Sequence, residues 1–137
     1  MGEKPGLKRL DRMGATADIP YTRTLNDVKR SMPEVGPRPN DFVINNKMTY
    51  SVYYETDLEL LLKTLGVDTV VIIGIKTNTC DLCSSFETAN RGYIVIAISD
   101  CVAGAYGQDL HIFGLQNIAR ALGWVLTIPE FEEKLSS

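Results

Sequence analysis

The sequence has neither an excess of positive charge nor a long apolar run. Aspartate and glutamate number 17 and lysine and arginine 14, so the formal net charge is −3. This balance provides no broad basic surface, and we expect neither nucleic acid nor a membrane as a partner. No apolar run is long enough to cross a membrane, and the N-terminal stretch MGEKPGLKRLDRMG has no apolar segment of the kind found in signal peptides.

Cysteine is also scarce. The three cysteines are Cys80, Cys83 and Cys101, and the first two lie within one helical turn, which is not the pattern of a disulfide framework. Free thiols are typical of a reducing compartment, so we expect a cytoplasmic protein. The 137 residues, 45% of them apolar, are enough for one domain with its own core, and there is no internal repeat. We therefore take residues 1–137 as a single domain.

Strand and helix patterns alternate along the chain. The predicted strands are DIPYTRTL, DFVINN, TVVIIGI, YIVIAIS and WVLT, and the predicted helices are LKRLDRM, the segment after Thr56, residues 78–91, residues 109–122 and PEFEEKL. The helix after Thr56 begins with a predicted capping box between Thr56 and Glu59 and ends at Gly66. TVVIIGI and YIVIAIS are apolar on both faces, which is typical of central strands in a parallel sheet. The alternation predicts a three-layer α/β fold with a mainly parallel sheet.

Cys80 lies where chemistry is expected in such a fold. It follows the strand TVVIIGI at the start of the next predicted helix, and ligands bind outside the carboxyl ends of parallel strands. The N–H groups and dipole of a helix N-terminus favour a thiolate and can hold an oxyanion. A small buried residue fits the same position equally well.

Lys47 follows DFVIN and is therefore expected at the same sheet edge as Cys80. There its positive charge would stabilise a neighbouring thiolate. The alternative is a lysine that is simply exposed to solvent.

Four segments resemble the isochorismatase-like cysteine hydrolases. GIKTNTC resembles their nucleophile turn, G-x-x-T-[ND]-x-C, and ANRGYIVIAISDCVA resembles the helix end, strand and small-residue loop that follow it there. NDFVINNKMTYSVYYETDLELLLKTLGV resembles the segment in which a lysine precedes Y-S-x-[FY] and a helix cap, and LQNIARALGWVLTIPEF resembles the C-terminal helix and strand. The resemblance implies a Rossmann-like α/β/α sandwich and an amidohydrolase. Such an enzyme cleaves a C–N bond of a small amide or carbamoyl compound through a thioester intermediate.

The resemblance also assigns roles to individual residues. Cys80 would be the nucleophile and Lys47 the lysine of the catalytic triad. The backbone N–H groups of Cys80 and Lys76 would form the oxyanion hole, and the bond between Ile75 and Lys76 is the place of a non-proline cis peptide. Beside the pocket would lie Tyr50, Ser51 and Tyr53, and Gln108 would contact a carbamoyl group.

No cofactor is implied, and no metal is expected. Some nicotinamide-hydrolysing relatives hold a metal with an aspartate and two histidines, whereas this chain has one histidine, His111. We expect His111 to be a surface or cap residue. We expect Asp100 to belong to a turn at a strand end.

Two features differ from the family pattern. The triad aspartate of the family ends an N-terminal strand in a pattern such as L-x-x-x-D-x-Q, which is absent here, and neither Asp11 nor Asp18 lies in its place. We therefore expect the chain to lack that first strand, to expose sheet edges and to form a homo-oligomer.

In the nucleophile turn, Lys76 and Asp81 replace residues that are usually small or apolar. Asp81 would oppose thiolate formation on Cys80, and Lys76 would offset this effect.

Two other functions stay open at this point. Without a visible aspartate, the chain could be a catalytically impaired or non-catalytic family member that acts as a subunit. The Cys80-x-x-Cys83 pair at a helix start is also the arrangement of a thiol-redox protein. Against the redox interpretation, the sequence has no Trp-Cys-Gly-Pro-Cys turn and predicts parallel units rather than a mixed sheet. The sequence favours a cysteine hydrolase.

Overall fold

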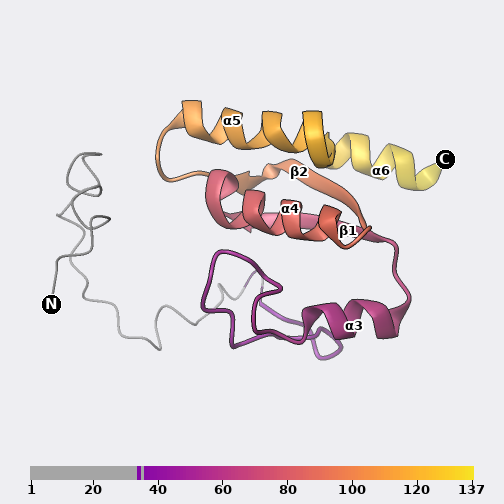
Figure 1. The fold of residues 1–137 in the computed structure, drawn as a ribbon. Helices are drawn as coiled ribbons and strands as arrows, with labels where there is room; N and C mark the ends of the chain where they lie inside the picture. Colours follow the sequence, from indigo (N-terminus) through magenta and orange to yellow (C-terminus); the bar gives the residue numbers. More distant parts are fainter. Residues whose placement is uncertain (1–33, 35) are drawn as a thin grey trace, which may run out of the picture. The chain divides into compact units, whose positions relative to one another are not determined.

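The computed structural model describes residue 34 and residues 36–137, so the predicted helix LKRLDRM and strand DIPYTRTL lie outside the described residues. The chain divides into two compact units, Met1–Val43 and Ile44–Ser137. The second unit contains, in order, α3 (Leu58–Leu65), β1 (Thr69–Ile75), the π-helical turn η2 (Thr77–Asp81), α4 (Leu82–Asn90), β2 (Ile94–Ala103), α5 (Gln108–Asn117), the π-helical turn η3 (Ile118–Leu122), β3 (Gly123–Leu126) and α6 (Ile128–Ser136) (Figure 1). None of the helices in this described part is long and apolar enough to cross a membrane.

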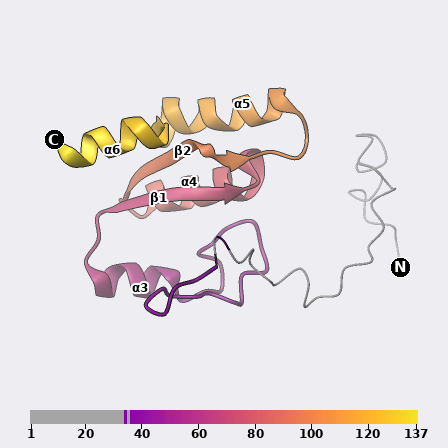
Figure 2. The ribbon, with the colours of Figure 1, turned by 180° about the vertical axis from the view of Figure 1, so that it is seen from behind.

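The three strands form a parallel sheet in the order β1-β2-β3. Both views show β1 and β2 side by side, with α4 on one face of the sheet (Figures 1 and 2). Each crossover between neighbouring strands is helical, as parallel pairing requires. The predicted α/β fold with a parallel sheet is therefore confirmed.

The core lies between the sheet and the α4 face. Val95 and Ala97 of β2 and Ile118 of η3 are at most 1% exposed. Packed around them are Ile72, Leu82, Ala89, Leu122 and Val125. Gly123 brings β3 close to β2, because a Cβ there would lie 2.1 Å from the carbonyl oxygen of Val95. This packing fixes the carboxyl end of β1 and hence the turn that follows it.

The opposite face of the sheet is only partly covered. Val71, Ile96 and Trp124 are aligned across the three strands, and they face away from the core because side chains alternate along a strand. Lys134 of α6 lies over the Trp124 ring, 5.4 Å from its centroid. Ile98 and Leu126 on this face are buried as well, whereas Ile73 near the end of β1 is 64% exposed, so the β1 side of the face is open in the described part of the chain. The expectation that β1 is a buried central strand is wrong for the described residues, where β1 is a sheet edge.

Two local expectations are also wrong. Residues 41–46 form no strand. A strand needs the backbone hydrogen bonds of a neighbouring strand, and none of the described strands pairs with this segment. The capping box at Thr56 does not form either. The helix begins at Leu58, and Thr56 instead donates its hydroxyl hydrogen to the Val52 carbonyl at 2.5 Å. Glu59 accepts hydrogen bonds from Lys63 and Arg91, which lower the pKa of its carboxyl group.

Candidate active site around Cys80

A wide turn at the carboxyl end of β1 carries Cys80. The peptide bond between Ile75 and Lys76 is cis, at the position where the resemblance places such a bond. The chain then enters η2, where the backbone N–H groups of Thr79 and Asp81 both donate to the Lys76 carbonyl at 3.1 Å. Cys80 is half-buried near the end of this turn, and α4 begins two residues later. The predicted helix 78–91 therefore consists of a π-helical turn followed by α4.

The two cysteines of the pair lie in different surroundings. Cys80 belongs to η2, whereas Cys83 lies in the first turn of α4, and both are free thiols. Burial raises the pKa of the Cys83 thiol, and the nearby Glu87 and Cys80 raise it further, while the charge of Lys47 lowers it. A thiol with a raised pKa holds less thiolate at neutral pH and reacts more slowly.

We therefore predict that Cys80 reacts faster than Cys83 with iodoacetamide at pH 7. The physical reason is that burial and the Glu87 carboxylate oppose formation of the thiolate at Cys83. Time-resolved labelling with mass-spectrometric site mapping measures the two rates. The result that contradicts the assignment is faster labelling at Cys83 or at Cys101.

Lys47 lies within electrostatic reach of this turn. It is exposed, and its ammonium group donates to the Thr49 carbonyl. Its positive charge lowers the pKa of both Asp81 and Cys83. The structure thus brings Lys47 near the turn that holds Cys80, although Lys47 follows no strand.

The residues expected beside the pocket fall into two groups. Tyr53 is buried, and its hydroxyl is hydrogen-bonded to Thr88 of α4 at 2.9 Å, so it holds the segment before α3 against α4. Ser51 accepts a hydrogen bond from the Tyr53 backbone N–H. Tyr50 and Gln108 are exposed, and their side chains are open to solvent.

Lys76 and Tyr106 form a polar rim beside the turn. The Lys76 ammonium donates to the Tyr106 hydroxyl at 3.0 Å and lies 4.4 Å from the centroid of its ring. The sequence did not predict the contact between Lys76 and Tyr106, because the two residues are 30 positions apart in the chain.

The expectation that Asp100 belongs to a turn at a strand end is wrong. Asp100 lies within β2 and accepts a hydrogen bond from the Ile128 backbone N–H at the start of α6.

His111 has a role that sequence reasoning missed. Its Nδ1 atom is hydrogen-bonded at 2.8 Å to the hydroxyl of Thr77, which is fully buried at the start of η2. The two helical segments touch closely here, because a Cβ at Gly114 of α5 would lie 3.0 Å from the Thr77 carbonyl oxygen. His111 is therefore not a simple surface or cap residue, and it ties α5 to the turn that carries Cys80.

We predict that replacing His111 with alanine lowers the free energy of unfolding by about 1–3 kcal/mol, the usual cost of leaving a buried polar group without its partner. Urea denaturation measures the change. In a Thr77→Val background the same replacement should cost clearly less, because no hydroxyl is left unpaired there. Equal costs in the two backgrounds would show that the hydrogen bond does not stabilise the fold.

The burial of Asp81 is the second feature of the turn that the sequence did not predict. Its side chain is 6% exposed, and its Oδ2 atom has no hydrogen-bond partner among the residues that the structure describes. Burial raises the pKa of this carboxyl group, and the charge of Lys47 lowers it. The Oδ1 atom lies 3.9 Å from the place of a Cβ on Gly74, so the carboxylate is next to the end of β1.

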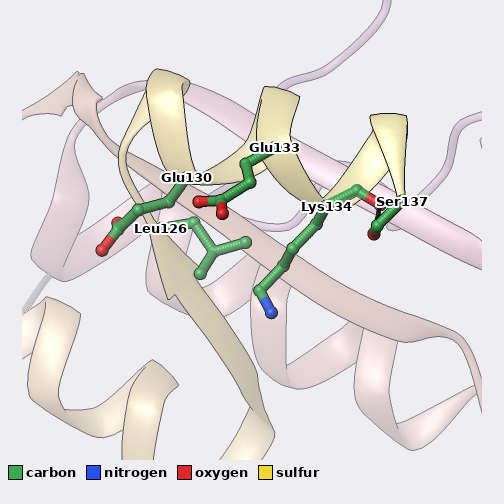
Figure 3. A pocket seen from close by; sticks show the side chains of 5 residues that line it. All are labelled: Leu126, Glu130, Glu133, Lys134 and Ser137. Carbon is green, nitrogen blue, oxygen red and sulfur yellow. Dashed lines mark hydrogen bonds between the residues drawn. The ribbon is translucent and has the colours of Figure 1, made fainter.

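A surface depression lies at the C-terminal helix. It is lined by Leu126, Glu130, Glu133, Lys134 and Ser137 (Figure 3). Glu130 takes part in the capping box of α6, in which it accepts from the Thr127 backbone N–H at 2.7 Å. None of the lining residues belongs to η2, so this depression is separate from the Cys80 turn.

In the described part of the chain, no group of three histidine, cysteine or acidic residues is placed to hold a metal ion.

Comparisons with known proteins agree with one another. A family model described as "Isochorismatase domain" matches residues 23–130. The ureidoacrylate amidohydrolase RutB of Methylobacterium radiotolerans is 36% identical over 99 residues, which are 72% of this chain and 38% of that protein. The chain thus spans well under half of the length of this curated relative.

Solved structures show the same likeness. An isochorismatase-like hydrolase from Alkaliphilus metalliredigens superposes with a TM-score of 0.73 at 29% identity, covering 77% of this chain and 57% of that chain. N-carbamoylsarcosine amidase from Thermoplasma acidophilum, at 24% identity, shares the fold with a TM-score of 0.68, covering 93% of this chain and 66% of that chain.

Proposed function

Because the chain belongs to the isochorismatase family, we propose that it hydrolyses the C–N bond of a small amide or carbamoyl compound, with Cys80 as the nucleophile. The observation that carries this proposal is the place of Cys80, on a turn at the carboxyl end of a parallel strand, within the matched residues. The name of the 36%-identical relative, a ureidoacrylate amidohydrolase, supports the substrate class.

The proposed reaction has two stages. The Cys80 thiol loses its proton, and the thiolate attacks the carbonyl carbon. The C–N bond then breaks, the amine leaves with that proton, and the acyl group stays on sulfur as a thioester. Water then cleaves the thioester, giving the acid and the free thiol. The backbone N–H groups of Cys80 and Lys76 are proposed to hold the oxyanion, and the charge of Lys47 is proposed to stabilise the thiolate.

The substrate pocket is proposed to lie over this turn. Tyr50 and Gln108 are exposed and available to contact a substrate, whereas the hydroxyl of Tyr53 is already used by Thr88. The Lys76 ammonium, beside Tyr106, is available for an acidic group of a ureido acid. A reducing cytoplasm, which keeps Cys80 reduced, is the proposed location.

A panel of small amides, ureido acids and nicotinamide tests the proposal. Ammonia or amine release is followed, and intact mass spectrometry detects an acyl group on the protein. Release or an adduct with at least one member supports the proposal. No product and no adduct with any member, from folded protein whose Cys80 still reacts with iodoacetamide, would favour a non-catalytic subunit. Reversible oxidation of Cys80 and Cys83 to a disulfide would favour thiol-redox chemistry.

We also propose that the chain assembles with a second copy through the open sheet face. Val71, Ile73 and Trp124 are exposed there, and β1 has one unpaired edge in the described part of the chain, which is an arrangement that favours association. We predict a dimer or larger species by sedimentation velocity. Ile73→Lys should shift the distribution toward the monomer. A wild-type monomer across the micromolar range contradicts the proposal.

A further inference from the structure

The side chain of Lys76 is a cation at the turn that carries Cys80. It is half-buried, and none of the ion pairs among the described residues includes it. The backbone carbonyl of Lys76 accepts from the N–H groups of Thr79 and Asp81 at 3.1 Å, so Lys76 and Cys80 belong to one helical turn. The proposed nucleophile therefore has a positive charge within one turn of it, and no carboxylate of the described residues neutralises that charge.

Tyr106 fixes the place of this cation. The Lys76 ammonium donates to the Tyr106 hydroxyl at 3.0 Å and lies 4.4 Å from the centroid of the ring. These two contacts hold the end of an otherwise flexible stem. Tyr106 lies in the loop between β2 and α5, at the same end of the sheet as the carboxyl end of β1 (Figure 2). This is the end at which parallel sheets bind their ligands.

The Lys76–Tyr106 pair has hydrogen-bond donors that its own contact does not use. A lysine ammonium has three donors, and one of them goes to Tyr106. The Tyr106 hydroxyl accepts this bond, so its own O–H group is still available to donate. Tyr106 is 43% exposed, and a ligand can therefore reach it from solvent. Two neighbouring donors, one of them charged, suit the two oxygens of a carboxylate.

We infer that Lys76 and Tyr106 form a carboxylate-binding subsite, which makes the enzyme prefer amides that carry an acidic group close to the scissile C–N bond. This inference rests on the proposed function and narrows its substrate class. The carboxylate accepts from the Lys76 ammonium and from the Tyr106 hydroxyl while the amide carbonyl lies at Cys80. A neutral amide gains no charge pair at this subsite.

The ratio of two alkylation rates isolates this recognition. Iodoacetate and iodoacetamide both lose iodide to the attacking sulfur, and they differ in that one carries a carboxylate and the other a neutral amide. Both react with the same thiolate, so a change in the amount of thiolate cancels in the ratio of the two rates. The iodoacetate-to-iodoacetamide ratio at Cys80 therefore reports the attraction of a carboxylate, and it requires no amide turnover.

The ratio is measured on the full chain at pH 7 by mass-spectrometric site mapping. We expect Lys76→Met to lower the ratio at Cys80 about fivefold, the effect of one pair of opposite charges about 4 Å apart in water. Lys76→Arg keeps the charge and should keep most of the ratio. Tyr106→Phe removes the hydroxyl and keeps the ring, so it should lower the ratio about two- to threefold, a typical effect of one hydrogen bond. Lys63→Met on α3 is the matched loss of a distant positive charge and should leave the ratio unchanged.

Salt gives an independent readout of the same contact. The Debye length falls from about 30 Å at about 0.01 M salt to about 3 Å at about 1 M salt. The wild-type ratio at Cys80 should therefore decrease as KCl is added and approach that of Lys76→Met, whose own ratio should change less.

Turnover tests the substrate preference directly. A ureido acid is compared with its methyl ester, which has the same C–N bond and no negative charge. Lys76→Met should lower kcat/KM for the acid more than for the ester, and mainly through KM, because the carboxylate is held equally in the substrate and in the transition state.

Two outcomes overturn the inference. One is a ratio at Cys80 that is the same in Lys76→Met as in the wild type. The other is an equal decrease in Lys63→Met, which would show that net charge alone attracts iodoacetate. If Lys76→Met does not fold, Lys76→Gln removes the same charge and keeps a polar side chain at this half-buried position.

The alkylation ratio also separates this inference from the proposed function. A ratio that depends on Lys76, in a protein that forms neither product nor adduct with any amide, supports the subsite and overturns the hydrolase. Amide hydrolysis with a ratio that does not depend on Lys76 supports the hydrolase and overturns the subsite.

Discussion

Replacing Cys80 with alanine is expected to abolish both amide hydrolysis and the covalent adduct, with a loss of at least about a thousandfold in turnover. Removal of the nucleophile of a covalent mechanism leaves only the weak rate that binding and oxyanion stabilisation provide. Ammonia release and intact mass, both measured with the most reactive amide of the panel, give the two readouts.

The matched control for this prediction is Cys83→Ala. It removes the same group from the neighbouring turn, where burial and Glu87 raise the pKa of the thiol. We expect this variant to keep the adduct and most of the turnover. Hydrolysis that persists in Cys80→Ala at a rate near that of the wild type would place the nucleophile elsewhere.

The second large effect concerns Lys47. Lys47→Ala is expected to slow acylation of Cys80 by about 100- to 10,000-fold, the usual range for loss of a group that assists in forming or protonating the reacting atoms. Lys47→Arg keeps the positive charge and should recover part of the rate. The single-turnover rate of adduct formation measures the effect directly.

A distant lysine provides the control. Lys63 on α3 forms an exposed ion pair with Glu59 at 2.6 Å, and pairs of this kind contribute little to stability or function. Lys63→Ala should leave acylation unchanged. If Lys47→Ala acylates as fast as Lys63→Ala, the lysine of the site has been misassigned.

The sequence by itself determined the parallel α/β arrangement and the location of Cys80. The strands β1, β2 and β3 form where TVVIIGI, YIVIAIS and WVLT predict them, because runs of apolar and β-branched residues favour strands locally. Gly66 ends α3 with a φ of 65°, a conformation that glycine adopts without strain. The turn between β1 and α4 follows from the order of these elements alone.

Tertiary structure decided the features that depend on partners distant in the chain. Glu59 closes no capping box and instead accepts hydrogen bonds from Lys63, four residues away, and from Arg91, 32 residues away. The segment 41–46 has strand-like residues but no described partner, so it forms no strand.

The surroundings of the nucleophile turn were decided in the same way. His111 meets Thr77 across 34 residues, and Asp81 is buried next to the end of β1 within reach of the charge of Lys47. A local pattern reports whether a residue prefers burial. It does not report which group will face that residue, because this depends on how helices and strands pack in three dimensions.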